Sequence, residues 1–304
     1  MAAPMRSTDF RAIVEPILNE EFDGVYEQRD DEWNQVFKQV KGIPRTYHEE
    51  PVLYGFAAAP ELPDGQPVTY QSGGVIFTQR YLYRVYGLAF ALTKVLVEDG
   101  DHIRIGQIFS RHLAQSLIET KETLCANFLN RAFNAAFPVG DGVSLINPNH
   151  PIVSGVFSNQ LATAAAFSQT SVEQLLIQIR NAVDNNGKRI RLQPKKLVLS
   201  PSNVFQGEVV LKSVLRSGTA NNDINPVKSL GLLSGGQANL SRLTSATAWF
   251  IQTDAPEGLK LVQRRGLEKA MEGDFETDSM RFKATERYAV GVTDPRALFG
   301  TPGL

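Results

Sequence analysis

The chain has 304 residues, 42% of them hydrophobic, and its 31 lysines and arginines nearly balance 32 aspartates and glutamates, for a formal net charge of −1. The length and hydrophobic content allow one or two domains with real cores, while the charge balance argues against coating nucleic acid, which needs a basic excess. The single cysteine, Cys125, excludes a disulfide or a cysteine-built zinc site within one chain.

The first 46 residues predict an arm without a core of its own. No apolar segment of the kind found in signal peptides follows Met1. Ser7-Thr8-Asp9 can cap a helix with apolar residues at helical spacing, although Pro16 weakens its middle. Apolar residues such as Trp33 and Phe37 are then sparse, so we expect this segment to lie on another surface.

Residues 47–86 predict a long two-stranded excursion with an irregular tip. Four prolines and the turn signal Asp64-Gly65 separate extended segments at residues 52–56, 68–70 and 75–83. An isolated hairpin is marginally stable in water, so we expect this one to pack on another surface. The apolar run that follows, residues 85–97, is too short to span a bilayer and carries Lys94. The chain is therefore expected to be soluble and intracellular where it is made, with no membrane partner.

A long helix is predicted at about residues 99–136, capped by Asp99 or Asp101 and ending near Phe137-Pro138. Apolar and histidine side chains recur there at steps of three, four or seven: Ile105, Ile108, Phe109, His112, Leu113, Leu117, Leu124, Phe128 and Phe133. Some thirty residues at about 1.5 Å each span roughly 45–50 Å. We interpret this helix as a spine, longer than most compact domains need.

Residues 141–256 predict a mixed α/β unit. A capping box at residues 171–174 opens a helix that Asn185-Asn186-Gly187 ends. A strand is expected at residues 197–199, followed by a helix with Ser200 as its cap. Residues 217–226 predict a polar loop, and residues 248–251 a buried strand.

The clearest strand covers residues 278–292, where apolar side chains occupy even positions from Met280 to Val292. Alternation with period two predicts one buried face. Residues 259–271 are the expected partner strand, connected through residues 272–274.

The sequence contains no phosphate-binding loop, dinucleotide-binding fingerprint, metalloprotease motif or nucleophile elbow. The four histidines, His48, His102, His112 and His150, are scattered and are interpreted as structural. Cys125 is expected to be a buried structural thiol. The basic run at residues 188–191 could face nucleic acid, but we favour a solvated loop. We therefore predict no catalytic, cofactor-binding or metal-binding residue, no cofactor and no enzymatic activity.

The order of these segments resembles the major capsid proteins of tailed bacteriophages with the Hong Kong 97-type (HK97-like) α+β fold. Six stretches are similar to that family: residues 93–99 before the spine helix, 194–201, 221–226, 248–250, 274–278 and 290–297. The resemblance implies an N-arm (1–46), an E-loop (47–86), a peripheral domain (87–140 and 257–292) and an axial domain (141–256 and 293–304). The arm and the hairpin cannot bury their aromatics alone, so we expect both to lie on neighbouring subunits. The hairpin side chains expected to be buried there are Tyr54, Phe56, Phe77, Tyr81 and Tyr83.

The resemblance further implies a virion protein, assembled in the host cytoplasm, whose pentamers and hexamers form an icosahedral head. That head encloses double-stranded DNA without sequence-specific binding, and portal, scaffolding and decoration proteins are further partners. The chain is short before the hairpin, so we expect a separate scaffolding protein or none. Two alternatives stay open: an encapsulin-like shell around cargo protein, and a soluble α/β enzyme.

Overall fold

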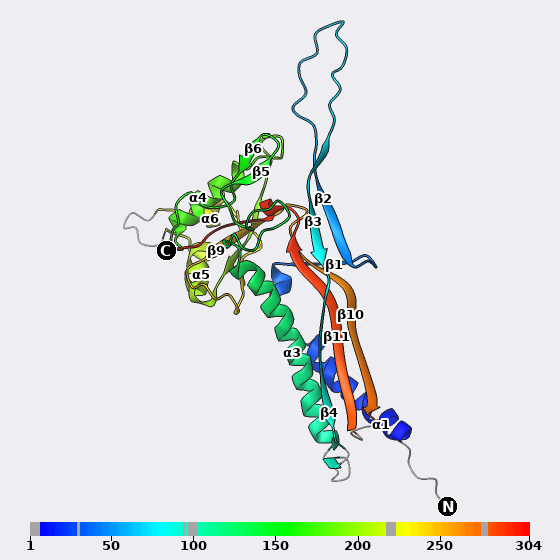
Figure 1. Cartoon of the computed structure of the whole chain (residues 1–304). Helices are drawn as coiled ribbons and strands as arrows, with labels where there is room; N and C mark the ends of the chain where they lie inside the picture. The colour runs from blue at the N-terminus through cyan, green and yellow to red at the C-terminus, as the bar shows by residue number, and fades with distance from the viewer. Residues whose placement is uncertain (1–6, 29–30, 94, 97–101, 217–222, 275–278) are drawn as a thin grey trace, which may run out of the picture.

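The computed structural model describes residues 7–28, 31–93, 95–96, 102–216, 223–274 and 279–304. Figure 1 shows three parts: a long helix with a long sheet beside it, a hairpin that projects beyond that sheet, and a compact α/β part where the C-terminus lies. The long helix is α3 (His102–Asn130). This elongated arrangement is the one the segment order predicted.

The long sheet has the strand order β1-β10-β11-β4. β10 (Leu259–Asp274) and β11 (Ser279–Val292) are antiparallel, as predicted, and β4 (Arg84–Leu92) pairs with the other side of β11. Phe282, Ala284 and Tyr288 are buried, which confirms the alternating pattern. The predicted connection at residues 272–274 is wrong, because these residues continue β10 opposite β11; residues 275–278 lie outside the described part of the chain.

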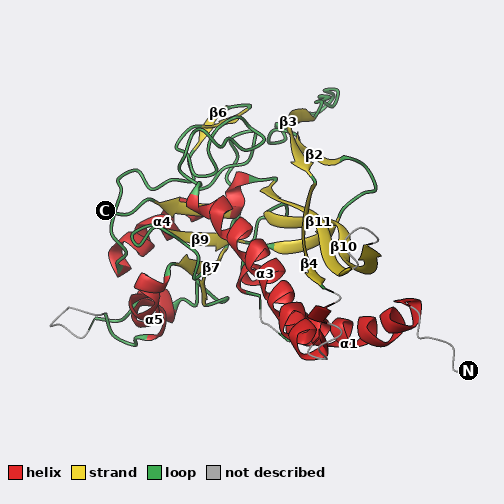
Figure 2. Cartoon of the chain, turned by 60° about the horizontal axis from the view of Figure 1, so that its bottom comes forward, coloured by secondary structure: helices red, strands yellow, loops and turns green. Residues whose placement is uncertain are grey.

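The N-terminal segment lies on another surface, as expected, but that surface belongs to its own chain, so the expectation that it needs a neighbouring subunit is wrong. Helix α1 (Ser7–Glu27, with Pro16 inside it) lies against α3 and the long sheet (Figure 2). Its side chains Val14, Leu18 and Phe22 are at most 1% exposed and join a core with residues of α3, β10 and β11. The few apolar residues of α1 are sufficient because α3 and the long sheet supply the rest of this core.

The segment after α1 is also part of the core. It forms the short helix η1 (Glu32–Gln35) and β1 (Lys38–Lys41), which pairs in parallel with the start of β10. Trp33 and Phe37 are buried at the junction of the long sheet and the α/β part, in a core that also contains Phe250 and Tyr288. The two parts of the molecule are therefore joined by one continuous hydrophobic core.

The spine helix is shorter than predicted. After Asn130 the backbone amides of Ala132, Asn134 and Phe137 bond three residues back instead of four, so the chain continues as turns to residue 137. The Asn134 side chain accepts a hydrogen bond from the amide of residue 136, a local bond that competes with helix. The buried face is also displaced: Phe109 is 42% exposed, although the pattern placed it inward. The predicted caps Asp99 and Asp101 lie outside the described residues.

The α/β part is built on a second sheet with the order β12-β9-β7-β8. Its strands are β7 (Pro194–Leu199), β8 (Gln237–Asn239), β9 (Trp249–Thr253) and β12 (Leu298–Thr301). Around them lie α4 (Gln169–Arg180), α5 (Val204–Lys212), α6 (Pro226–Ser229), η2 (Pro201–Asn203), η3 (Pro295–Ala297) and the small hairpin β5 (His150–Ile152) and β6 (Gly155–Phe157). The predicted buried strands at residues 197–199 and 248–251 are confirmed.

Two predicted caps are wrong in this part. Helix α4 is capped by Ser168, whose hydroxyl accepts a hydrogen bond from the amide of Ser171. The amide of Ser168 in turn donates to the hydroxyl of Ser171. It ends at Arg180, before the predicted stop, and Ser200 makes no side-chain cap. Most of the predicted polar loop, residues 217–222, lies outside the described residues.

Candidate assembly surfaces

The hairpin projects from the body, and its tip is not covered by the rest of the described chain. β2 (Tyr47–Tyr54) and β3 (Gly74–Leu82) pair antiparallel, and residues 55–73 form an irregular tip, which confirms the predicted excursion (Figure 1). Every residue of the tip is exposed. Four of them are large and apolar: Phe56 (59% exposed), Leu62 (52%), Val68 (67%) and Tyr70 (96%). A group of exposed apolar side chains on a projecting arm is typical of a surface that a partner covers.

The base of the hairpin, in contrast, is anchored to its own chain. Tyr81 and Tyr83 are buried with Val262 and Ala289, so the expectation that neighbouring subunits bury these two tyrosines is wrong. The hydroxyl groups of Tyr81 and Thr293 are 2.6 Å apart. β4 continues directly from this base into the long sheet, which fixes the direction in which the hairpin leaves the body.

An ion pair reinforces the base. Lys260 Nζ lies 2.5 Å from Glu50 Oε2, and both side chains are largely buried. Burial alone would raise the pKa of Glu50, but hydrogen bonds from Lys260, Thr293 and His48 lower it overall. The carboxylate therefore stays charged and holds β2 to β10.

Side chains of the α/β part also hold the hairpin through its backbone. Asn185 and Asn186 donate to the carbonyl oxygens of Leu53 (3.2 Å) and Gly55 (2.9 Å), and Lys188 Nζ donates to that of Phe56 (2.6 Å). The basic run at residues 188–191 is thus a partly solvated turn, as favoured from the sequence, but its lysine has a specific structural role. These contacts therefore reach the first two residues of the tip, Gly55 and Phe56.

A buried charged cluster joins α1, α3 and β11. Lys121 Nζ lies 2.9 Å from Glu286 Oε2, with side chains only 9% and 2% exposed. Tyr26 completes the cluster: its hydroxyl donates to Glu286 and accepts from Lys121 at 2.7 Å. Burial, then the Glu286 charge, raises the pKa of Tyr26. We did not predict this cluster from the sequence, although Glu286 occupies an even position within the apolar alternation of its strand.

A second polar cluster joins the N-terminal segment, the spine helix and the α/β part. Arg242 forms ion pairs with Glu32 (3.1 Å) and Glu119 (2.5 Å). Beside them Glu122, 3% exposed, accepts a hydrogen bond from the Trp33 amide at 3.1 Å. Burial raises the pKa of Glu122 to about 7, even though Arg242 opposes the shift.

The raised pKa of Glu122 predicts a pH-dependent stability. The folded chain binds this proton more tightly than the unfolded chain, so the stability it contributes is present below pH 4.5 and is lost as the pH rises through about 7. Glu122→Gln keeps the acceptor for the Trp33 amide but cannot ionise, so its free energy of unfolding should fall less over that range. Urea unfolding of the unassembled subunit at several pH values measures this, with Glu119→Gln, more exposed on the same helix, as control. Parallel profiles for wild type and Glu122→Gln would refute it.

The remaining candidate residues have structural surroundings. His150 is 1% exposed and lies between Asp141 (Nδ1–Oδ2 2.5 Å) and Asn159 (Nε2–Oδ1 3.0 Å). His112 is exposed on α3, and Cys125 is buried, which raises the pKa of its thiol. Within the described ranges, no group of three or more His, Cys, Asp or Glu side chains could hold a metal ion. No helix in the described part of the chain is long and apolar enough to cross a membrane.

Solved structures similar to this chain include a virus-like particle and several phage capsids. A virus-like particle from Pyrococcus furiosus matches with a TM-score of 0.52 and 11% identity, over 94% of this chain and 98% of that chain. The capsid of cyanophage P-SCSP1u matches with a TM-score of 0.58 and 12% identity, over 90% and 88%. The mature capsid of bacteriophage PhiM1 matches with a TM-score of 0.53 and 14% identity, over 90% of this chain and 87% of that chain. No curated protein sequence matches this chain.

The fold is therefore that of the HK97-like capsid proteins. A family model described as phage capsid protein matches residues 82–300. Because this is well over half of the chain, the protein belongs to the phage capsid protein family. It is a structural component of the virion and not an enzyme, which confirms the class predicted from the sequence and removes the α/β-enzyme alternative.

The hairpin composition predicts that the shell is not covalently cross-linked through it. A covalent bond from a hairpin lysine to a neighbouring subunit cannot form, because this sequence has no lysine between Lys41 and Lys94. We expect purified particles, boiled in denaturant, to run as a single band of the 33.5 kDa chain on electrophoresis. A ladder of covalent oligomers would refute this.

Proposed function

We propose that the chain assembles with copies of itself into pentamers and hexamers that close into an icosahedral head around double-stranded phage DNA. The observation that carries this proposal is the contrast between the body and the hairpin tip. The body buries most of its large apolar side chains in cores of one chain, although some, such as Phe205 (85% exposed), remain on its surface. In residues 55–73 every residue is exposed, including all four large apolar side chains. Each exposed aromatic or leucine that a neighbour buries would contribute on the order of 1.5–3 kcal/mol, repeated at every contact.

We assign each part of the fold to one domain of an HK97-like capsid subunit. Residues 47–86 act as the E-loop, residues 87–140 and 257–292 as the peripheral domain, and residues 141–256 and 293–304 as the axial domain around capsomer centres. Residues 1–46 act as an N-arm, whose helix α1 lies on the peripheral domain of its own subunit. The net charge of −1 suits a container, because a strongly basic lining would bind packaged DNA tightly. Portal, scaffolding and decoration proteins are the further partners we propose.

The content of isolated particles tests the proposal against an encapsulin-like shell. Particles purified from a producing culture and treated with nuclease should protect genome-length double-stranded DNA. The matched measurement is mass spectrometry of the protein inside. Particles that contain a single folded cargo enzyme and no DNA would support the encapsulin-like alternative and refute a DNA-filled head.

A further inference from the structure

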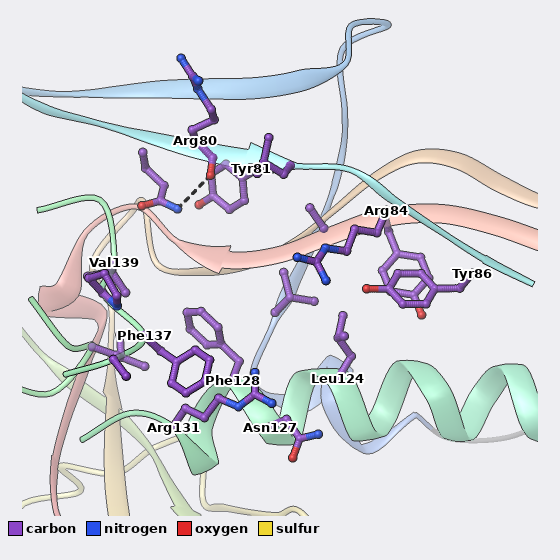
Figure 3. A pocket seen from close by; sticks show the side chains of 18 residues that line it. Arg80, Tyr81, Arg84, Tyr86, Leu124, Asn127, Phe128, Arg131, Phe137 and Val139 are labelled. Carbon is purple, nitrogen blue, oxygen red and sulfur yellow. Dashed lines mark hydrogen bonds between the residues drawn. The ribbon is translucent and has the colours of Figure 1, made fainter. Parts of the chain in front are cut away.

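A pocket of about 500 Å³ lies at the base of the hairpin, between β4, β11 and the end of α3 (Figure 3). Its floor is apolar and aromatic, with side chains from all three elements and from the turns after α3: Tyr86, Leu124, Phe128, Phe137 and Tyr288. Phe137 is 47% exposed. The pocket therefore offers an apolar surface large enough for more than one side chain.

Two arginines line this pocket without a carboxylate partner. Arg84 lies on β4, and Arg131 directly follows the last residue of α3. Both side chains line the pocket and are exposed (Figure 3). Neither forms an ion pair with any carboxylate of the described residues. Arg131 instead lies over the ring of Phe137, 4.4 Å from its centroid. Arg80, at the edge of the same pocket, is different because it pairs with Glu49 at 2.6 Å. An occupant of this pocket should therefore combine apolar side chains with two negative charges.

The tip of the hairpin has that composition. Residues 55–73 contain two acidic residues, Glu61 and Asp64, and no lysine or arginine. Both acidic residues are exposed and form no ion pair within the described part of the chain. Between them lies Leu62, 52% exposed, and the turn is shaped by Pro63 and by Gly65 at φ +78°. The tip thus presents one leucine flanked by two carboxylates, the complement of an apolar pocket flanked by two guanidinium groups.

A chain cannot place this tip in its own pocket. The pocket includes residues 79–82 at the hairpin base, and the two arms run from there away from the body (Figure 1). Extended chain advances about 3.3 Å per residue, so a tip nearly twenty residues farther along reaches tens of ångströms beyond the pocket. The occupant is therefore a second copy.

We propose that the tip of one subunit docks in the pocket of its neighbour, with Leu62 on the apolar floor and Glu61 and Asp64 against Arg84 and Arg131. This inference rests on the proposed assembly and assigns the surface that receives the hairpin. It also explains why the two arginines remain unpaired in the single chain. Ionic contacts at such a rim fix partner and register more than they add affinity.

Charge reversal tests the docking. The double variant Arg84→Glu/Arg131→Glu should fold with an unchanged melting temperature but lose shell formation in sedimentation velocity at least tenfold relative to wild type. Adding Glu61→Arg and Asp64→Arg to the same chain should restore shells. Arg104→Glu, an exposed charge reversal at the other end of α3, should assemble normally. Shells from the double variant, or no rescue by the compensating pair, would overturn the assignment.

Disulfide trapping gives a second, independent readout. With Cys125 replaced by alanine, cysteines at Leu62 and Asn127 should join neighbouring subunits into oxidised oligomers within assembled particles. Cysteines at Leu62 and Arg104 should not, because residue 104 lies on the same helix roughly 35 Å from residue 127 at about 1.5 Å per residue. If wild type fails to form shells, the proposed function fails. If shells form but Leu62 joins residue 104 and not residue 127, only the docking assignment fails.

Discussion

Replacing Lys121 with methionine is expected to lower the free energy of unfolding of the unassembled subunit by about 3–5 kcal/mol. The substitution leaves Glu286, whose side chain is 2% exposed, as an unpaired charge between α1, α3 and β11. Tyr26 still donates one hydrogen bond, but it supplies no positive charge. Urea unfolding of the subunit, followed by circular dichroism, measures the loss.

Two controls distinguish the buried pair from a general effect of charge removal. Lys121→Met combined with Glu286→Leu removes both charges and should recover most of the stability. Arg265→Met breaks an exposed ion pair with Glu268 (3.1 Å) on the same sheet and should change the free energy of unfolding by about 1 kcal/mol or less. A similar small effect for Lys121→Met would show that the cluster does not stabilise the junction of the three elements.

Replacement of residues 55–73 by an Asn-Gly turn is expected to abolish shell formation while leaving the subunit folded. Tyr54 and Gly74 are paired in the ladder, so a two-residue turn closes the shortened hairpin without a change of register. All residues removed are exposed, so the hydrophobic core loses none of its buried side chains. Sedimentation velocity and negative-stain electron microscopy measure assembly, and thermal unfolding measures the fold.

A Gly/Ser segment of the same length as the tip is the matched control. It restores the reach of the hairpin but not its apolar and acidic side chains, and it should also fail to form shells. Shells from this variant would mean that hairpin length, not tip chemistry, supports assembly. Shells from the shortened hairpin would contradict the role assigned to the tip altogether.

Several features of this fold were predictable because local pattern and tertiary structure agree there. The alternation that ends at Val292 marks a strand with one buried face, and β11 has that form. Prolines and a glycine turn between extended segments predicted the irregular hairpin tip. Nothing in the described fold buries the apolar residues of that tip, which is why a partner surface could be expected from the sequence.

The wrong predictions concern residues whose burial depends on contacts between segments far apart in the sequence. Phe22 and Trp33 belong to a segment with few apolar residues, and this pattern does not show whether the same chain or a neighbour buries them. Both are buried by other parts of the same chain. No local pattern marks Lys121 as buried, because its partner Glu286 is 165 positions away. The pocket at the hairpin base likewise combines segments far apart in the sequence, so no local motif marks it.

Expression of the chain alone, followed by sedimentation velocity and electron microscopy, tests the central claim most directly. The account predicts closed shells of uniform size, which appear either with the chain alone or when a scaffolding protein is supplied. Monomers or dimers as the only species at high concentration, with and without scaffold, would contradict it.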